Sequence, residues 1–322
     1  MGNFPTHKDK LSGNFSHVNS IHGSQTISRA RTAFFTVFCA CLPALAGVAV
    51  FSGAAGAADD IPTWLEGELQ LGVGVDYSRG DYEESLDTEI VFVPFSLTML
   101  FDGFALTPTE RDQVELKVVV PLLHIDGAIT AGSSESEEET GLGDVIVGAS
   151  YLYYPRRTLV PAVELKVNVK IPTADEDDGL GTGKTDVGLG ATLFQRYGDL
   201  VPFVSGGYRF IGENEPDYAL RNGATAGAGV SWIFTPRYSI GASYDWRQAI
   251  SKRTDESSNL VRADDSHELT FFGSARIGGG LRVAPYTVIG LSDGSPDYAV
   301  GLQLSVGIPI RNPPPSREPF GD

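Results

Sequence analysis

The chain has 322 residues, with 41 acidic and 24 basic side chains and a formal net charge of −17. This acidity argues against a nucleic-acid-binding protein, because phosphate binding draws on a surplus of Lys and Arg. Two cysteines are too few for a disulfide scaffold or a four-cysteine zinc site. The length allows one or two domains, and a mean hydropathy of −0.05 gives no sign of a bundle of membrane helices.

Residues 1–57 have the organisation of a secretory signal peptide with a long polar extension. The polar stretch ends in Arg29 and Arg31, and an apolar run broken by Pro43 follows. A basic region, an apolar region and an A-x-A site at Ala55-Gly56-Ala57 are the marks of a secretory signal. The alternative is a membrane anchor, since the apolar run is almost long enough to span a bilayer. The proline and the small residues after the run favour cleavage, which would remove both cysteines.

Alternation with period two runs through the rest of the chain. From Leu65 to Tyr77 the odd positions are mostly apolar and the even positions are polar residues or glycine. Side chains of a strand point to opposite faces with period two, so such a segment has one apolar and one polar face. The sequence predicts twelve strands of this kind, at about 64–78, 88–101, 111–125, 144–154, 159–171, 185–197, 201–211, 223–234, 238–250, 266–277, 281–291 and 298–310.

The links between these segments alternate between short and long. Tight links follow the fourth, sixth, eighth and tenth segments, whereas long acidic links such as 126–143 and 172–184 follow most odd-numbered ones. Bacterial outer-membrane barrels have an even number of strands, short periplasmic turns, long extracellular loops and aromatic residues at both interfaces. A β-sandwich would also alternate, but it needs neither the aromatic residues at both ends nor the loop asymmetry. The predicted fold is all-β: a transmembrane antiparallel up-and-down β-barrel over 58–310, followed by a Pro-rich tail at 311–322.

Two prolines stand in the middle of predicted strands. Pro94 and Pro285 lack the amide donor that each residue of a closed barrel contributes to the ladder. We therefore expect irregular pairing, such as a bulge, at both positions.

Strand parity places many charged side chains on the inward face of the predicted barrel. Burying them without water would be costly unless all were paired, so the lumen is either a water-filled channel or a plug of salt-bridged side chains. Inward-facing small residues such as Gly188, Gly229 and Gly301 leave room, which favours a narrow polar channel. The predicted channel-lining residues are Glu66, Glu68, Asp76, Glu115, Lys117, Glu164, Lys166, Lys170, Asp186, Arg196, Arg209, Asp245, Arg247, Glu268, Arg276 and Arg282.

Residues 179–185 look like a phosphate-binding loop at first sight. The motif requires glycine where Asp178 stands and a helix where a strand pattern begins, so a flexible outer loop is the better interpretation. The acidic runs 134–139 and 175–178 invite a weak divalent-cation site. Ala174 occupies the first ligand position of an EF-hand, however, and a solvated, self-repelling loop explains both runs more simply.

Catalysis has little support in the predicted mature chain. A Ser/His arrangement needs a histidine beside a serine. Parity places the only two histidines, His124 and His267, on the apolar face near the outer ends of their strands. We expect no enzyme, no catalytic residue, no metal and no cofactor.

Three short glycine-rich phrases carry a family resemblance. They are Gly141-Leu142-Gly143-Asp144, Lys170-Ile171-Pro172-Thr173, and residues 179–183 followed by Thr185-Asp186. They resemble the outer-membrane family associated with the MetA pathway of phenol degradation, most strongly over 141–190. The resemblance implies a barrel that passes aromatic or other hydrophobic small molecules. The chain departs from common barrels by continuing past its last predicted strand.

The predicted function is a porin-like channel in the outer membrane of a Gram-negative bacterium, for passive uptake or efflux of small molecules. Selectivity would come from the pore diameter and the charged rings of the lumen. The alternative is a structural or surface-interaction barrel with a plugged lumen and acidic extracellular loops. The expected partners are outer-membrane lipid, a small-molecule permeant and the barrel assembly machinery, but no nucleic acid.

Overall fold

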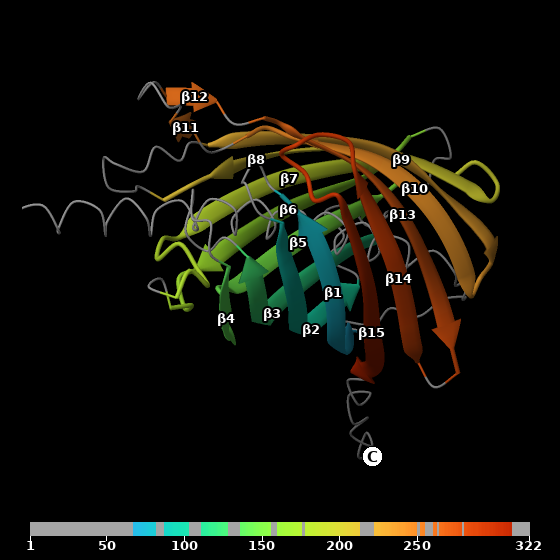
Figure 1. Ribbon diagram of the computed structural model, residues 1–322. Coiled ribbons are helices and arrows are strands. Elements are labelled where there is room, and N and C mark those ends of the chain that lie inside the picture. The colour runs from blue at the N-terminus through green and yellow to red at the C-terminus, as the bar shows by residue number, and fades with distance from the viewer. Residues whose placement is uncertain are drawn as a thin grey trace, which may run out of the picture.

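The computed structural model describes residues 67–81, 87–102, 111–127, 136–155, 160–175, 178–212, 222–249, 252–254, 260–262, 264–278 and 280–310 (Figure 1). The predicted signal peptide and the predicted Pro-rich tail lie outside the described residues. In the ranges given, regular secondary structure consists of strands, and no helix is long and apolar enough to cross a membrane.

The described part of the chain forms fifteen strands. They are β1 (Gly67–Gly80), β2 (Thr88–Asp102), β3 (Arg111–Gly127), β4 (Glu137–Leu142), β5 (Val145–Tyr154), β6 (Ala162–Ile171), β7 (Asp186–Phe194), β8 (Leu200–Phe210), β9 (Gly223–Thr235), β10 (Tyr238–Arg247), β11 (Lys252–Thr254), β12 (Leu260–Arg262), β13 (Ser266–Ile277), β14 (Leu281–Gly290) and β15 (Tyr298–Ile310).

Twelve of these strands close into a ring of antiparallel pairs. Each pairs with its neighbours in chain order, β15 pairs with β1, and β2 pairs with β3. The short strands β11 and β12 form a separate hairpin in the link between β10 and β13 (Figure 1). The twelve predicted segments correspond to β1–β3, β5–β10 and β13–β15, so the predicted twelve-stranded up-and-down barrel is confirmed.

The sequence pattern predicts a loop where the structure has the strand β4. In the ring of strands, β4 and β5 share one position. Both strands pair with β3. The strand β4 pairs with Leu122–Gly127 of β3, and β5 pairs with Arg111–Val119 of β3. The register changes by one residue between them, at Gly143 and Asp144, which is a β-bulge. Both of these residues are buried, because the extra residue reverses the parity and turns two successive side-chain positions toward the interior.

The two mid-strand prolines interrupt the ladder as expected. The β1–β2 pairing skips the residues opposite Pro94, and the β13–β14 pairing skips those opposite Pro285. Pro121 lies directly opposite Pro94, at the step where β3 changes partner from β5 to β4. Each of Pro94 and Pro285 thus lies beside a gap in the ladder on one side and within continuous pairing on the other.

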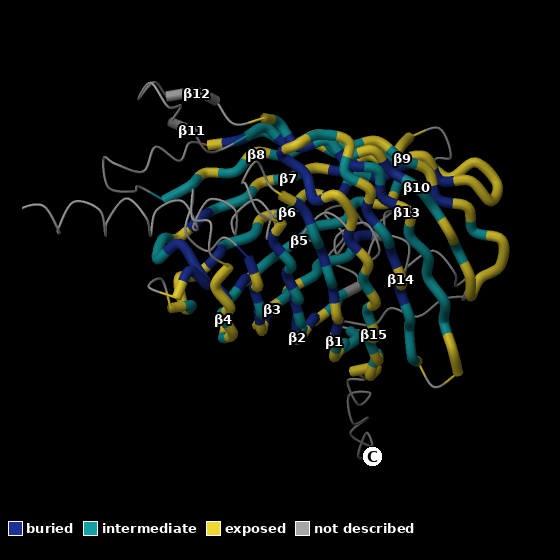
Figure 2. The backbone as a smooth tube through the Cα atoms, viewed as in Figure 1, coloured by how far each residue is buried: buried dark blue, intermediate teal, exposed yellow. Residues whose placement is uncertain are grey.

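The apolar face of the barrel points outward, as the alternation predicts. On β1, Leu71 is 50 % exposed whereas Asp76 on the other face is 2 % exposed, and Figure 2 shows this alternation along the strands. A large apolar band is stable only against lipid or a partner. Every strand of the ring contributes one of the following exposed apolar side chains: Leu71, Phe95, Leu116, Val147, Leu165, Leu189, Val204, Val230, Ile240, Phe271, Ile289 and Leu302.

Aromatic side chains gather on the outward face near both ends of the barrel. Trp232, Phe234 and Tyr238 pack together at the β9–β10 turn, with ring centroids 5.7 and 6.3 Å apart. Tyr77 and Tyr298 pack at 6.1 Å at the opposite end. The long links, including 172–185 and 248–265, leave this second end, which is called the outer end below because outer-membrane barrels carry their long loops outside.

Candidate channel interior

Most of the predicted lining residues lie on inward positions of barrel strands. Six of them are buried: Asp76, Glu164, Lys170, Asp186, Arg247 and Glu268. Eight are half-buried: Glu68, Glu115, Lys117, Lys166, Arg209, Asp245, Arg276 and Arg282. Glu66 lies outside the described residues. The polar face of the barrel thus encloses both acidic and basic groups.

Arg196 is not placed in the interior. The strand β7 ends at Phe194, three residues earlier than the predicted segment 185–197, and Arg196 lies exposed in the turn before β8. Its Nε donates a hydrogen bond of 2.8 Å to the carbonyl of Gly198. Gly198 has a φ of 63°, a left-handed conformation that ends the alternation and tightens the turn.

The space beside the inward glycines differs from one to the next. At Gly188 and Gly190 a Cβ would meet no atom closer than 4.0 and 3.7 Å, so room is present there, as expected. At Gly229 the ring of Phe203 occupies the space, and at Gly301 the ring of Tyr286 does. The expectation that all these glycines leave room is therefore wrong at the last two, where an aromatic ring covers the glycine.

The half of the interior nearer the β9–β10 turn, called the inner half, carries a belt of acidic and basic side chains. Lys166 Nζ lies 3.0 Å from Glu164 Oε2, and Lys117 is attracted by Glu115 and repelled by Lys166. Glu115 of β3 and Lys166 of β6 stand on either side of Ser150 of β5, whose side chain is small.

The same belt reaches the opposite wall of the barrel. Arg276 and Arg282 stand directly opposite each other on β13 and β14. Arg282 is attracted by Glu68 and by Glu115 of β3, although β3 and β14 are not neighbouring strands. The interaction between Glu115 and Arg282 therefore crosses the interior.

The outer half of the wall formed by β2 and β3 is apolar, which the prediction of a narrow polar channel did not include. Ile90 stands opposite Ile125, and Phe92 stands opposite Leu123. All four side chains are buried, with at most 5 % exposed. Leu123 and Ile125 lie an even number of residues after the inward-facing Lys117 on β3, so strand alternation predicts that they also face inward. The sequence therefore contained the information that places these two side chains inside.

Two smaller apolar clusters also lie inside. Tyr286, Val288 and Ala299 pack on β14 and β15 with Phe272 of β13. The other cluster lies at the inner end and combines Ala162, Phe194 and Val201 with Leu152, Phe203 and Ile233. The interior is therefore a charged belt between packed apolar regions.

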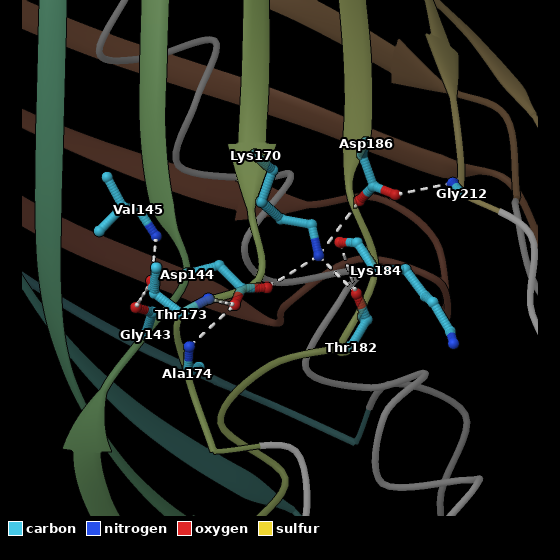
Figure 3. A network of polar contacts seen from close by, with 10 residues as sticks. All are labelled: Gly143, Asp144, Val145, Lys170, Thr173, Ala174, Thr182, Lys184, Asp186 and Gly212. Carbon is cyan, nitrogen blue, oxygen red and sulfur yellow. Dashed lines mark hydrogen bonds and ion pairs between the residues drawn. The ribbon is translucent and has the colours of Figure 1, made fainter.

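The three glycine-rich phrases meet in one buried polar cluster at the outer end (Figure 3). The Nζ of Lys170 on β6 lies 2.8 Å from Asp144 Oδ2 and 3.3 Å from Asp186 Oδ2. It also donates a 2.5 Å hydrogen bond to Thr182 Oγ1. Lys170 stands directly opposite Asp186 in the β6–β7 pair, whereas Asp144 reaches Lys170 because the β4–β5 bulge turns it inward.

Backbone donors complete this cluster. The Oδ1 of Asp144 accepts 3.1 Å hydrogen bonds from the backbone N–H groups of Thr173 and Ala174. The Oδ1 of Asp186 accepts one of 3.1 Å from Gly212, and Arg209 adds an electrostatic attraction to Asp186. Two acidic and two basic groups thus balance, which a cluster this deeply buried requires.

The link between β6 and β7 folds into the barrel at this cluster. Residues 179–182 are buried, and Leu180 is 2 % exposed. A Cβ on Gly141 of β4 would run into the Leu180 side chain, and a Cβ on Gly181 would lie 2.7 Å from both Asp144 Oδ1 and the Ala174 Cβ. The interpretation of residues 179–185 as a flexible outer loop is therefore wrong, because close packing fixes this segment against the wall. The strand β7 follows it, so the helix that a phosphate-binding loop needs is not there.

A second buried pair lies across the interior near the outer end. Arg247 of β10 is hydrogen-bonded to Glu268 of β13. Ser266 Oγ donates a 3.0 Å bond to Glu268 and lies 3.1 Å from Ser295 Oγ. Ser295, in the β14–β15 link, also donates to the carbonyl of His267. This pair therefore anchors another link against the strands.

The two histidines lie on the outward face, where parity places them. His124 Nδ1 lies 2.7 Å from Thr140 Oγ1, and His267 Nδ1 lies 2.6 Å from the Tyr244 hydroxyl. Over the described ranges, no group of three or more His, Cys, Asp or Glu side chains is arranged to hold a metal ion.

Sequence reasoning missed several groups that build the interior. Asp144 was noted only as part of a family phrase, because its inward direction depends on a bulge that the alternation does not reveal. Thr182 and Leu180 fall within the predicted flexible outer loop 179–185. Tyr286 reaches Asp76, to which it donates a hydrogen bond across Gly301, and no pattern within one strand predicts this contact.

A closed antiparallel barrel with an apolar band outside and charged side chains inside is an outer-membrane β-barrel, since only a ring without free edges satisfies every strand in lipid. More particularly, the chain belongs to the family described as "Putative MetA-pathway of phenol degradation", which matches residues 96–308. The matched range contains every residue of the buried polar cluster.

One solved structure shares the fold at a TM-score above 0.5, and others resemble the chain more distantly. An outer membrane channel from Pseudomonas putida F1 is 15 % identical, with a TM-score of 0.59 over 79 % of this chain and 100 % of that chain. The transport unit of the autotransporter AIDA-I from Escherichia coli is 12 % identical, with a TM-score of 0.45 over 82 % and 96 %. The toluene transporter TodX from P. putida is 10 % identical, with a TM-score of 0.36 over 77 % and 89 %. No curated protein matches the chain.

Proposed function

We propose that this outer-membrane barrel is a passive channel for small molecules, with aromatic or other hydrophobic compounds as its permeants. The observation that carries the proposal is the combination of a charged belt with inward positions that would accept a larger side chain inside a closed ring. The belt residues Glu115, Lys117 and Lys166 are only half-buried, and an added Cβ at Gly188 or Gly190 would meet its nearest neighbours at 4.0 and 3.7 Å, without a clash. Charged groups of this kind persist inside a barrel where water reaches them.

The apolar clusters support the choice of permeant. The apolar side chains Ile90, Phe92, Leu123 and Ile125 lie between the outer end and the charged belt, so a solute that crosses the barrel has to pass them. Apolar walls with a few polar groups are typical of sites that take small organic molecules. Membership of the phenol-degradation family and the name of the toluene transporter among the structural neighbours agree with such a permeant.

A specific observation favours the alternative, a structural or surface-interaction barrel with a plugged lumen. The apolar side chains at the outer end of β2 and β3 are almost completely buried, and the link between β6 and β7 packs against the same end of the barrel. In that case the outer loops would carry the function and no solute would cross.

Conductance separates the two functions. The purified full-length protein is inserted into planar lipid bilayers in KCl, and solute entry into proteoliposomes is followed for arabinose, glycine, benzoate and phenol. A channel gives single-channel steps, and its entry rates rank the aromatic solutes above a sugar of similar size. The absence of any conductance across the full voltage range, with correctly folded protein, would establish the plugged barrel instead.

A further inference from the structure

The inward-folded link between β6 and β7 controls access to the outer end. We propose that its tip, residues 179–183, is a gate, and that Thr182 and Leu180 hold it closed against the barrel wall. This inference rests on the proposed channel function and adds the element that regulates it.

A side-chain hydrogen bond and an apolar side-chain contact join the tip to the wall. Thr182 Oγ1 accepts a hydrogen bond from Lys170, whose ammonium group also contacts Asp144 and Asp186. When Thr182 leaves, Lys170 keeps both carboxylate partners. Opening of the tip therefore leaves no buried charge without a partner. An unpaired buried charge is the usual obstacle to breaking a buried ionic cluster.

Leu180 provides the apolar half of the closure. Its side chain packs against Gly141 on β4, where an added Cβ would overlap the Leu180 methyl group and force it to move. Gly143, two residues on, likewise has no space for a Cβ beside Pro121 and Leu123. The wall of β4 is thus shaped to receive the tip.

The backbone at both ends of the tip suits a turn that moves as one unit. Gly179 has a φ of 71° and Gly183 a φ of 62°, both in the left-handed region that glycine adopts without strain. The base of the link is held separately, because Thr173 and Ala174 donate to Asp144. The tip can consequently swing away while the base stays attached to the wall, as hinged gates do.

The gate is tested by releasing it and by locking it. Thr182→Val removes the hydrogen bond to Lys170 at constant volume, and Leu180→Ala removes the apolar contact. Thr192→Val is the matched control, since Thr192 is an inward, buried threonine of β7 that does not belong to the tip. For the lock, Gly141→Cys and Leu180→Cys are combined in a predicted mature chain that has no other cysteine, and the two thiols are joined by oxidation or by a short bifunctional reagent.

The readout is the open fraction of single channels in KCl, with folding checked by resistance of the unheated barrel to SDS. The proposal expects the open fraction to rise several-fold in Thr182→Val and Leu180→Ala, to stay at the wild-type level in Thr192→Val, and to vanish on cross-linking and return on reduction. Equal conductance of the cross-linked and reduced forms would overturn the gate and leave the channel function standing. Lack of conductance in every folded variant, the released ones included, would overturn the channel and the gate together.

Discussion

Gly301 and Gly188 are both inward-facing glycines of barrel strands, but the atoms around them differ. The ring of Tyr286 lies over Gly301, and its hydroxyl group reaches Asp76 on the far side of that glycine. At Gly188 the nearest atom to an added Cβ is the Asn168 carbonyl oxygen at 4.0 Å. The same residue type thus closes the interior at one position and leaves space at the other.

This difference predicts opposite effects of the same substitution. Gly301→Ala forces the Tyr286 ring to move and should lower the free energy of unfolding by about 1–3 kcal/mol, the usual cost of overpacking. Gly188→Ala should be neutral or stabilise by about 0.5–1 kcal/mol, because it reduces the freedom of the unfolded chain without a clash. Urea unfolding in lipid vesicles, followed by tryptophan fluorescence, measures both. Similar losses at the two positions would show that Tyr286 does not pack on Gly301.

At the scale of the element, each strand of the ring is a boundary between lipid and lumen. Leu189 and Gly190 are successive residues of β7, yet the first is 48 % exposed on the outward face and the second faces the open part of the interior. Because the two positions lie at the same depth, the same substitution at each differs only in whether the new side chain faces lipid or the lumen.

Arginine at these two positions should therefore behave differently. Leu189→Arg places a charge in the hydrocarbon region and should cost about 2–4 kcal/mol of folding free energy near the bilayer midplane. Gly190→Arg places the same charge beside water and Lys166, and its cost should be well below that value, although it should reduce conductance by filling the lumen. Folding titrations in vesicles compare the two variants. A penalty at Gly190 as large as that at Leu189 would contradict the assignment of faces.

At the scale of the whole molecule, the charges of the interior fall into two groups with different roles. Lys170 is held between Asp144 and Asp186 in the outer cluster, so it supports the wall and the gate. Lys117 and Lys166 belong to the half-buried belt, and in the proposed channel their charge would face a passing ion. Ion selectivity should therefore depend on the belt.

We expect the double variant Lys117→Glu with Lys166→Glu to shift the channel toward cations, because negative groups in a pore attract cations and repel anions. Reversal potentials under a tenfold KCl gradient measure the shift. The control is Arg237→Glu, a charge reversal at an exposed residue of the β9–β10 turn, which should leave the reversal potential within a few millivolts of wild type. An unchanged potential in the double variant would remove the belt from the ion pathway.

The sequence by itself determined the number of strands in the ring, their order and the face that each turns to the lipid. These follow from the period-two geometry of a strand, which is a local property, and a ring of such strands is the arrangement that satisfies their backbones in a membrane. The parity also placed Asp76, Glu164 and Arg247 inside. It failed at Arg196, because a left-handed glycine ends the strand pattern nearby.

Only the tertiary structure decided what fills the barrel. The inward turn of Asp144 depends on a bulge between β4 and β5, and the burial of Leu180 depends on a glycine nearly forty positions earlier in the chain. Whether an inward glycine leaves space depends on the side chain that a neighbouring strand supplies, as Tyr286 does for Gly301. Contacts between distant segments carry no periodic signal, so the wall of this barrel could be predicted from its sequence and the contents of its lumen could not.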